Sequence, residues 1–269
     1  MPTRETRLLV TAHTGCGEAP ANTWASLMEA AATGADVAEL DIRVTCKDEP
    51  VLLHDHSLLL ELYDARELNR MPARARLGPP HREHGLVMLA DVLEEAKRRG
   101  LMLNLDIKNG ESVNPALRLV KELQAERLVF VTGCTEGIEV DTEGISLLLN
   151  VPESADAASN EGATGAVDAA QNAAAAGNGA MNAAAEGAFI RSVCEQAKRQ
   201  GYRGVNVPFE RCSPDFVACA HALGLIVSVY TVDDADAMRS LMNMKVDSIT
   251  TKRPEQLLRL RKVDERHEA

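Results

Sequence analysis

Short runs of apolar residues alternate along this chain with longer stretches in which apolar residues recur at helical spacing. The first run, near residues 8–12, is followed by a predicted helix at 23–33 and a second apolar run at 37–44. This strand–helix–strand order predicts parallel strands joined by crossover helices. Candidate strands occur at nine places: 8–12, 37–44, 51–53, 101–107, 128–131, 145–151, 204–208, 226–232 and 246–250.

This alternation predicts an α/β fold, a TIM (β/α)8 barrel of parallel strands. A chain of 269 residues fits one such barrel, which takes about 250 residues, so we expect residues 1–269 to form a single domain. Nine candidate strands are one too many for an eight-stranded barrel. The run at 51–53 is the weakest candidate, because a tight turn rather than a helix precedes it.

Helices are predicted wherever an amphipathic stretch has capping and stop residues at its ends. These stretches cover 23–33, 91–99, 115–125, 188–200, 215–224, 234–244 and 254–261. Two other stretches depart from the alternation. Residues 57–86 combine three prolines with scattered Arg and His, which predicts an irregular excursion over one barrel end. Residues 153–188 are dominated by Ala, Asn, Gly and Ser, which predicts a low-complexity insertion or cover within the domain.

Composition and charge restrict the class of partner. The chain carries 29 basic and 40 acidic residues, a net charge of -11, which argues against nucleic acid or an anionic membrane surface as a partner. The six cysteines form no CxxC pair, which indicates free thiols in a reducing compartment. No run of ~18 apolar residues predicts a membrane span. We therefore expect a cytoplasmic protein.

Acidic residues interrupt two of the predicted strands. Glu39 and Asp41 lie two apart in an otherwise apolar strand, so both project from one face. An unpaired carboxylate in such a place costs several kcal/mol, which predicts a shared cation. Asp106 and Lys108 repeat the spacing on a later strand. Three carboxylates with no other obvious counter-ion predict an oxygen-ligated Mg²⁺ or Ca²⁺.

Two histidines, His13 and His54, also follow predicted strands. Functional groups of a parallel α/β barrel gather at the carboxyl ends of its strands, so we expect both histidines near the acidic residues. Histidines can act as general base and general acid near neutral pH. Lys108 could neutralise an anionic oxygen in the same place.

The order of these motifs resembles that of the glycerophosphodiester phosphodiesterase family, which has a phospholipase-C-like barrel. The resemblance rests on six segments: His13-Thr14-Gly15, Pro20-Ala21-Asn22-Thr23, Glu39-Leu40-Asp41, Thr45-Cys46-Lys47-Asp48, His54-Asp55 and Asp106-Ile107-Lys108. The stretch 229–257 is also similar to the closing part of the family's sequences. The resemblance thus covers most of the chain outside 57–85 and 153–188.

The resemblance implies a role for each candidate residue. Glu39, Asp41 and Asp106 would hold the divalent cation, Mg²⁺ or Ca²⁺, and His13 and His54 would be the catalytic pair. The implied enzyme is a phosphoric diester hydrolase of glycerol and lipid metabolism. Its small-molecule substrate would be a glycerophosphodiester, cleaved to an alcohol and glycerol 3-phosphate.

On the substrate side, the resemblance implies that Lys108 contacts the phosphate and that Thr14 stands where the family has an arginine. Ala21 replaces a glutamate of the family, and Asp106 replaces a longer glutamate. A hydroxyl cannot form a bidentate, charge-assisted clamp on phosphate, so two alternatives stay open. The barrel could be weakened or inactive and only bind a phosphate-bearing ligand, or it could be a sphingomyelinase D-like phospholipase with a shifted substrate. In the latter case the lost contact would come from another arginine: Arg43, Arg74, Arg76 or Arg82.

Each candidate also has a simpler interpretation. Glu39 and Asp41 could form an exposed strand end, Asp106 and Lys108 could pair only with each other, and His13 could be an ordinary turn residue. Structural or solvated roles are expected for the other histidines: His56, His81, His84, His221 and His267. A place in the core or in a pocket wall is expected for three aromatic residues: Trp24, Phe130 and Phe209.

Overall fold

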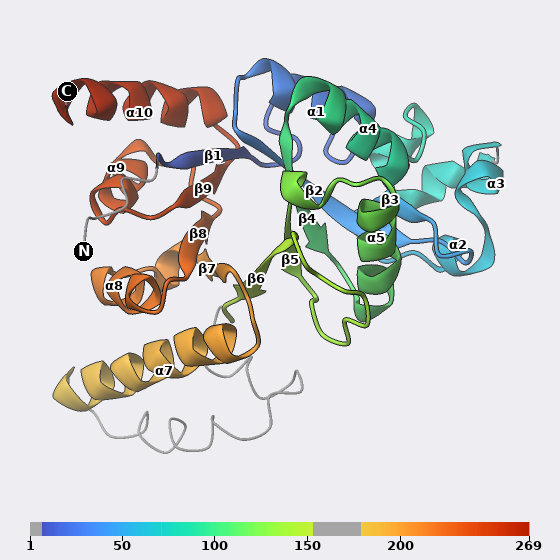
Figure 1. The fold of residues 1–269 in the computed structure, drawn as a ribbon. Helices are drawn as coiled ribbons and strands as arrows, with labels where there is room; N and C mark the ends of the chain where they lie inside the picture. Colours follow the sequence, from blue (N-terminus) through green and yellow to red (C-terminus); the bar gives the residue numbers. More distant parts are fainter. Residues whose placement is uncertain (1–6, 71, 153–178, 269) are drawn as a thin grey trace.

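The protein forms a closed barrel of parallel strands surrounded by helices (Figure 1). The computed structural model describes residues 7–70, 72–152 and 179–268. Each barrel strand pairs in parallel with its neighbours, and the ring closes where β1 pairs with β2. The predicted (β/α)8 fold is therefore confirmed. None of the helices within these ranges has the length and apolar character needed to cross a lipid bilayer.

Eight strands make up the barrel. They are β1 (Leu9–Ala12), β2 (Val37–Val44), β4 (Met102–Ile107), β5 (Val129–Gly133), β6 (Ser146–Asn150), β7 (Gly204–Pro208), β8 (Ile226–Tyr230) and β9 (Ser248–Thr251). A further strand, β3 (Pro50–Leu52), pairs antiparallel with the end of β2 and lies outside the ring. β3 is the weakest candidate of the sequence, and its exclusion follows from the tight turn before it, since a parallel barrel strand needs a longer crossover connection.

Helices cover the outer face of the barrel (Figure 1). They are α1 (Trp24–Ala32), α4 (Leu89–Arg99), α5 (Gly110–Glu122), α7 (Gly179–Arg199), α8 (Pro214–Ala222), α9 (Ala235–Asn243) and α10 (Pro254–Glu268). Alternate residues of β2 and β4 contribute to the buried core: Ala38, Leu40, Ile42, Leu103, Leu105 and Ile107. Because side chains alternate along a strand, the residues between these core positions share the opposite face.

The excursion at 57–86 is more regular than its proline content predicts. It contains two short helices, α2 (Leu58–Leu62) and α3 (Ala65–Arg70), followed by 3₁₀ turns at Pro72–Leu77 and Pro79–Arg82. Its apolar residues form a small core with the end of β3: Val51, Leu53, Leu60, Ala65, Leu68, Leu77 and Leu86. In Figure 1 the excursion lies beyond β3 at one end of the barrel. This second core explains why the segment folds although three prolines interrupt it.

Two other predicted boundaries differ from the structure. The helix expected to begin at Pro115 begins at Gly110, and Pro115 lies inside it. The prediction was wrong because proline is favoured at the first helical position, which hid the turn that precedes it. Of the predicted insertion at 153–188, residues 153–178 lie outside the described residues, while 179–188 belong to α7.

A buried arginine joins α10 to the amino-terminal end of the barrel. Arg261 is 5% exposed; it donates to the Leu8 carbonyl at 2.8 Å and forms an ion pair with Asp36. Asp36 also accepts from the Val10 N–H at 2.9 Å and pairs with Arg7 at 3.1 Å. Arg261 therefore connects the last helix to the residues that directly precede β1 and β2.

We expect Arg261→Ala to lower the free energy of unfolding by about 1–3 kcal/mol, the usual cost of leaving a buried polar partner unsatisfied. Asp36 keeps Arg7 and the Val10 amide, which limits the loss. Unfolding in denaturant measures this change in the free energy of unfolding. Arg259→Ala is the matched control, since Arg259 pairs with Glu255 at 3.9 Å with both side chains exposed, and it should change stability by less than about 0.5 kcal/mol. Equal effects of the two variants would refute the role given to Arg261.

Candidate active site

Three carboxylates from neighbouring strands meet inside the barrel. Glu39 and Asp41 on β2 are 6% and 3% exposed, and Asp41 lies beside Asp106 of β4 in the strand register. One oxygen of each of the three groups lies within 4.8 Å of the others. Side chains alternate between the two faces of a strand. The apolar residues of these strands therefore face the helices, and the acids come together on the inner face. The simpler interpretation as an exposed strand end is wrong, because Glu39 and Asp41 are buried.

Lys108 is the cation next to this acidic cluster. Its ammonium lies 2.6 Å from Asp41 Oδ1 and 2.5 Å from Asp106 Oδ2. Burial lowers the pKa of Lys108, but the charges of Asp106 and Asp41 outweigh it and raise that pKa to about 12. The lysine therefore remains protonated at neutral pH. Lys108 contacts acids on two strands rather than pairing with Asp106 alone.

Glu39 has no ion pair with Lys108, although their charges interact. Burial raises the pKa of Glu39 most, and the charge of Asp41 raises it further, to about 8. The Thr14 N–H, which donates to Glu39 Oε2 at 3.0 Å, favours the ionised form but does not offset burial. The cluster thus holds more negative charge than Lys108 neutralises, and this excess is what a hard divalent cation with oxygen ligands would compensate.

The raised pKa of Glu39 gives a testable pH dependence in metal-free protein. The folded state binds a proton at Glu39 up to about pH 8, whereas the unfolded chain loses it near the ordinary value of 4.5. This contribution to stability is fully present below the lower value and is lost as the pH rises through the higher one. We expect unfolding measured in EDTA between these two pH values to show a smaller decline for Glu39→Gln than for the wild type. Glu94→Gln, at a 59% exposed side chain, should keep the full decline; an unchanged decline in Glu39→Gln would contradict the assignment.

His13 follows β1 and lies beside Glu39. Its Nδ1 is 2.6 Å from the Thr14 carbonyl oxygen and 3.9 Å from Glu39 Oε2. A carbonyl oxygen only accepts hydrogen bonds, so Nδ1 carries the proton and Nε2 is the basic nitrogen of the neutral ring. Burial lowers the pKa of His13 below the ordinary value of 6.5, against the raising effect of its bond to the Thr14 carbonyl. A neutral imidazole with a free Nε2 is suited to accept a proton.

His54 follows β3 at the end of β2. The Leu53 N–H donates to the Asp41 carbonyl at 3.0 Å, and the Arg43 side chain donates to the His54 carbonyl at 2.9 Å. His54 Nδ1 lies 2.8 Å from Asp55 Oδ1. This bond is the largest cause of the lowered pKa of Asp55, and the charges of Arg43 and Lys108 lower it further. The charge of Lys108 thus acts on Asp55, and the imidazole side chain of His54 is 66% exposed.

Asn22 is a site residue whose role the sequence did not predict. Its side-chain amide donates to Asp41 Oδ2 at 2.5 Å and accepts from the Asp41 N–H at 3.1 Å. The backbone holds this position with φ of +59°, an uncommon left-handed value that asparagine tolerates better than most residues. The available signal was the place of Asn22 in the second motif of the resemblance, directly before Thr23, which caps α1.

Thr14 occupies a buried position between His13 and this asparagine. It is 4% exposed; its hydroxyl accepts from the Asn22 N–H at 2.7 Å, and its own N–H donates to Glu39. Thr14 therefore links the loop after β1 to the acidic cluster. A hydroxyl that accepts one hydrogen bond can still donate its proton, so these contacts leave one donor on Thr14.

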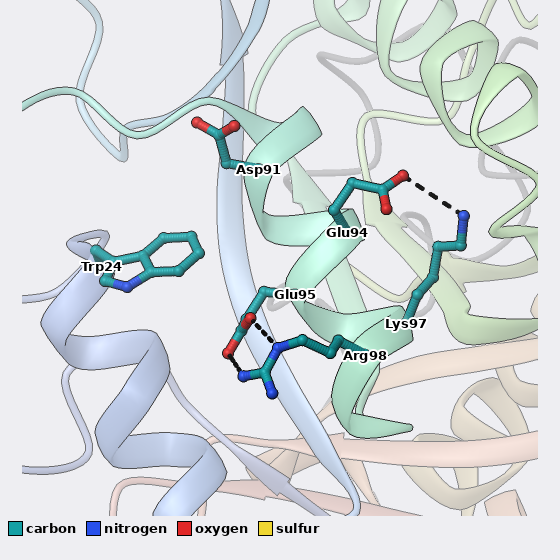
Figure 2. A pocket seen from close by; sticks show the side chains of 6 residues that line it. All are labelled: Trp24, Asp91, Glu94, Glu95, Lys97 and Arg98. Atoms are coloured by element: carbon teal, nitrogen blue, oxygen red, sulfur yellow. Dashed lines mark hydrogen bonds and ion pairs between the residues drawn. The ribbon is translucent and has the colours of Figure 1, made fainter.

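A surface groove lies apart from this cluster, between α1 and α4 (Figure 2). Its volume is about 830 Å³, and it is lined by Trp24, Asp91, Glu94, Glu95, Lys97 and Arg98. Trp24 is 40% exposed, so it forms a groove wall rather than part of the core. The Glu95 and Arg98 side chains pair at 2.5 Å. The groove contains no histidine and none of the clustered acids.

The protein is a (β/α)8 barrel with carboxylates, a lysine and a histidine gathered at the ends of its strands. These features define the class of α/β-barrel enzymes. The match with a family model is more specific. Residues 13–256 match the model of the glycerophosphoryl diester phosphodiesterase family. The chain belongs to this family, and it is thereby a phosphoric diester hydrolase.

Relatives of known name agree with this assignment. A Mycobacterium tuberculosis protein named "Probable glycerophosphodiester phosphodiesterase 2" is 28% identical over 88% of this chain and 84% of its own length. The fold is similar to a crystal structure of a glycerophosphodiester phosphodiesterase from Parabacteroides distasonis, with a TM-score of 0.69 and 18% identity over 96% of this chain and 98% of that chain. It is also similar to an Oleispira antarctica phosphodiesterase in complex with the product sn-glycerol-3-phosphate, with a TM-score of 0.67 and 20% identity over 93% and 95% of the two chains.

Proposed function

We propose that the protein is a metal-dependent phosphodiesterase that hydrolyses a glycerophosphodiester to an alcohol and glycerol 3-phosphate. The observation that carries the proposal is the buried cluster of Glu39, Asp41 and Asp106 beside Lys108. Membership of the family supports the reaction type. The glycerol phosphate bound to the Oleispira antarctica phosphodiesterase supports the product.

The acidic cluster fits a divalent cation. Glu39, Asp41 and Asp106 would hold it, because their oxygens converge and their charge exceeds that of Lys108. Carboxylate oxygens suit Mg²⁺ or Ca²⁺ rather than a metal that prefers sulfur or nitrogen ligands. When bound, the ion supplies positive charge that stabilises the non-bridging phosphate oxygens. Asn22 would keep Asp41 in position through its two hydrogen bonds.

His13 is the proposed general base. Its Nδ1–H is held by the Thr14 carbonyl, which leaves Nε2 to take a proton from the attacking water. The lowered pKa keeps the ring neutral at pH 7. The water oxygen then forms a bond to phosphorus while the bond from phosphorus to the alcohol oxygen breaks.

His54 is the proposed general acid. Asp55 accepts a hydrogen bond from the Nδ1–H of His54 at 2.8 Å, and the Nε2–H of His54 would be given to the departing alkoxide. The alcohol then leaves as a neutral molecule. Lys108 is the proposed phosphate contact, and the remaining donor of Thr14 is proposed to reach the substrate as well.

A panel of phosphodiesters assayed with Mg²⁺, Mn²⁺, Ca²⁺ or EDTA tests this function. We expect metal-dependent release of glycerol 3-phosphate from at least one glycerophosphodiester. The panel includes sphingomyelin and lysophosphatidylcholine, since a sphingomyelinase D-like activity is the alternative substrate class. Turnover that persists in EDTA would overturn the proposed metal dependence. We also propose a cytoplasmic location, supported by the absence of a CxxC pair among the six cysteines.

A barrel that binds a phosphate ligand without turnover is the second candidate function, and Thr14 is the observation that favours it. Restoring arginine separates the two. If the site is weakened, Thr14→Arg is expected to raise kcat/KM by about 10-fold or more, because a charge-assisted clamp on phosphate is roughly twice as strong as a neutral hydrogen bond. If Thr14 belongs to an adapted pocket, the variant loses activity, because the buried hydroxyl bonded to the Asn22 N–H is gone. Thr33→Arg, on a helix end outside the site, is the control and should leave kcat/KM unchanged.

A further inference from the structure

One amide atom of Asn206, inside the barrel, has no hydrogen-bond partner. This β7 residue is 6% exposed, and its Nδ2 donates to Asn150 Oδ1 at 3.0 Å, while its own Oδ1 has no hydrogen-bond partner. Turning the amide over would leave Nδ2 unpaired instead, so one polar atom stays unsatisfied in either orientation. Within the described residues, buried side-chain atoms without a partner occur on four residues, and Asn206 is the one that lies on a barrel strand. Buried polar groups rarely remain unpaired.

The strand register places Asn206 level with Glu39, one member of the acidic cluster. In a (β/α)8 barrel the tilt of the strands shifts the level of paired residues by about one residue per strand. Applied to the observed pairings, this shift puts four residues of alternate strands in one interior layer: Glu39, Thr132, Asn206 and Thr250. The next layer toward the carboxyl ends of the strands contains His13, Asp106, Asn150 and Tyr230.

Side-chain contacts agree with this layering. Thr132 of β5 donates to Asp106 of the next layer at 3.2 Å, and Asn206 of β7 likewise donates to Asn150 of that layer at 3.0 Å. β2 and β7 lie on opposite sides of the ring. The unpaired amide atom of Asn206 therefore faces the interior at the depth of Glu39, across the ring from β2.

We propose that Asn206, held by Asn150, is a specificity-determining residue that hydrogen-bonds a free hydroxyl on the polyol part of the substrate. A hydroxyl both donates and accepts, so it satisfies the unpaired amide atom in either amide orientation. The inference rests on the proposed function for the identity of the polyol, glycerol. A site that leaves a polar group unpaired discriminates strongly against a ligand that lacks the matching hydroxyl.

Calorimetric titration with two phosphomonoesters tests the inference separately from catalysis. The probes are glycerol 3-phosphate and n-propyl phosphate, which lacks both free hydroxyls, each titrated in Mg²⁺ into wild type, Asn206→Ala and Asn206→Ser. We expect the wild type to prefer glycerol 3-phosphate by about 10–100-fold. Asn206→Ala should lose that preference and bind propyl phosphate as the wild type does. Asn206→Ser should regain part of the preference, a result expected of hydroxyl recognition rather than of a structural role. Ser228→Ala, at a buried residue paired with Asn206 in the register, is the control and should keep the preference.

The inference is overturned if the wild type shows no preference, if Asn206→Ala weakens both ligands equally, or if it leaves the preference intact because the amide only binds a buried water. Assays of a glycerophosphodiester separate this from the proposed function. A binding preference that depends on Asn206, with no hydrolysis by the wild type, supports the inference and refutes the phosphodiesterase activity.

Discussion

Replacing His13 with alanine is expected to lower kcat by about 10²–10⁴-fold, the range that a positioned general base contributes. The reason is the fixed orientation of the ring: the Thr14 carbonyl holds Nδ1–H at 2.6 Å, and burial lowers the pKa of His13, so a neutral Nε2 is available at pH 7. Steady-state kinetics with a glycerophosphodiester at saturating Mg²⁺ measures the loss. Because the base acts only on the attacking water, we expect KM to change far less than kcat.

His56→Ala is the control for this measurement. His56 has a side chain that is 62% exposed and lies 3.5 Å from Glu61 on the excursion, so its removal should leave kcat within about twofold of the wild type. A loss of the same size in both variants, or full activity in His13→Ala, would remove His13 from the proposed mechanism.

Asp41→Asn is expected to have the second largest effect and to act on metal affinity. Loss of the outer hydrogen-bond partners of a metal ligand costs about 10–100-fold in affinity or activity, so loss of the charge on a ligand should cost more. Asp41 also contacts Lys108 at 2.6 Å and the Asn22 amide at 2.5 Å, and both contacts weaken when the carboxylate becomes neutral. Calorimetric titration of Mg²⁺ or Ca²⁺ into EDTA-treated protein measures the change.

The matched control is Asp64→Asn, because Asp64 is also a buried carboxylate with a lysine partner. It is 8% exposed, lies in the excursion rather than in the barrel, and pairs at 2.5 Å with Lys47 of the turn between β2 and β3. This variant is expected to lose stability but to keep the metal affinity of the wild type. Unchanged metal affinity in Asp41→Asn would mean that the ion binds elsewhere.

The sequence was sufficient for the barrel because its signals are local and periodic. The apolar runs of β2 and β4 and the helices between them follow from alternation and capping. The correct treatment of β3 followed from a single turn. The start of α5 was missed because Pro115 lies inside that helix, and α2 and α3 were missed because they are short and precede a proline-containing stretch. Tertiary packing against the small second core, which no local pattern reports, holds the excursion together.

The acidic cluster was predictable for a similar reason. Glu39 and Asp41 must share a strand face, and parallel strands end at one edge of the barrel, so their meeting with Asp106 follows from topology. The roles of Asn22 and Asn206 could not be found in this way. The role of Asn22 depends on a contact with a side chain far away in the sequence, and that of Asn206 on an amide atom that lacks a partner. Neither feature produces a recognisable spacing of residues in the sequence.

The most direct test is a crystal structure of the protein soaked in Mn²⁺, with anomalous scattering measured near the manganese edge. The account predicts one strong anomalous peak inside the barrel, at coordinating distance from oxygens of Glu39, Asp41 and Asp106, and no such peak in Asp41→Asn crystals. An interior without a peak, or a peak bound only by surface carboxylates, would contradict it.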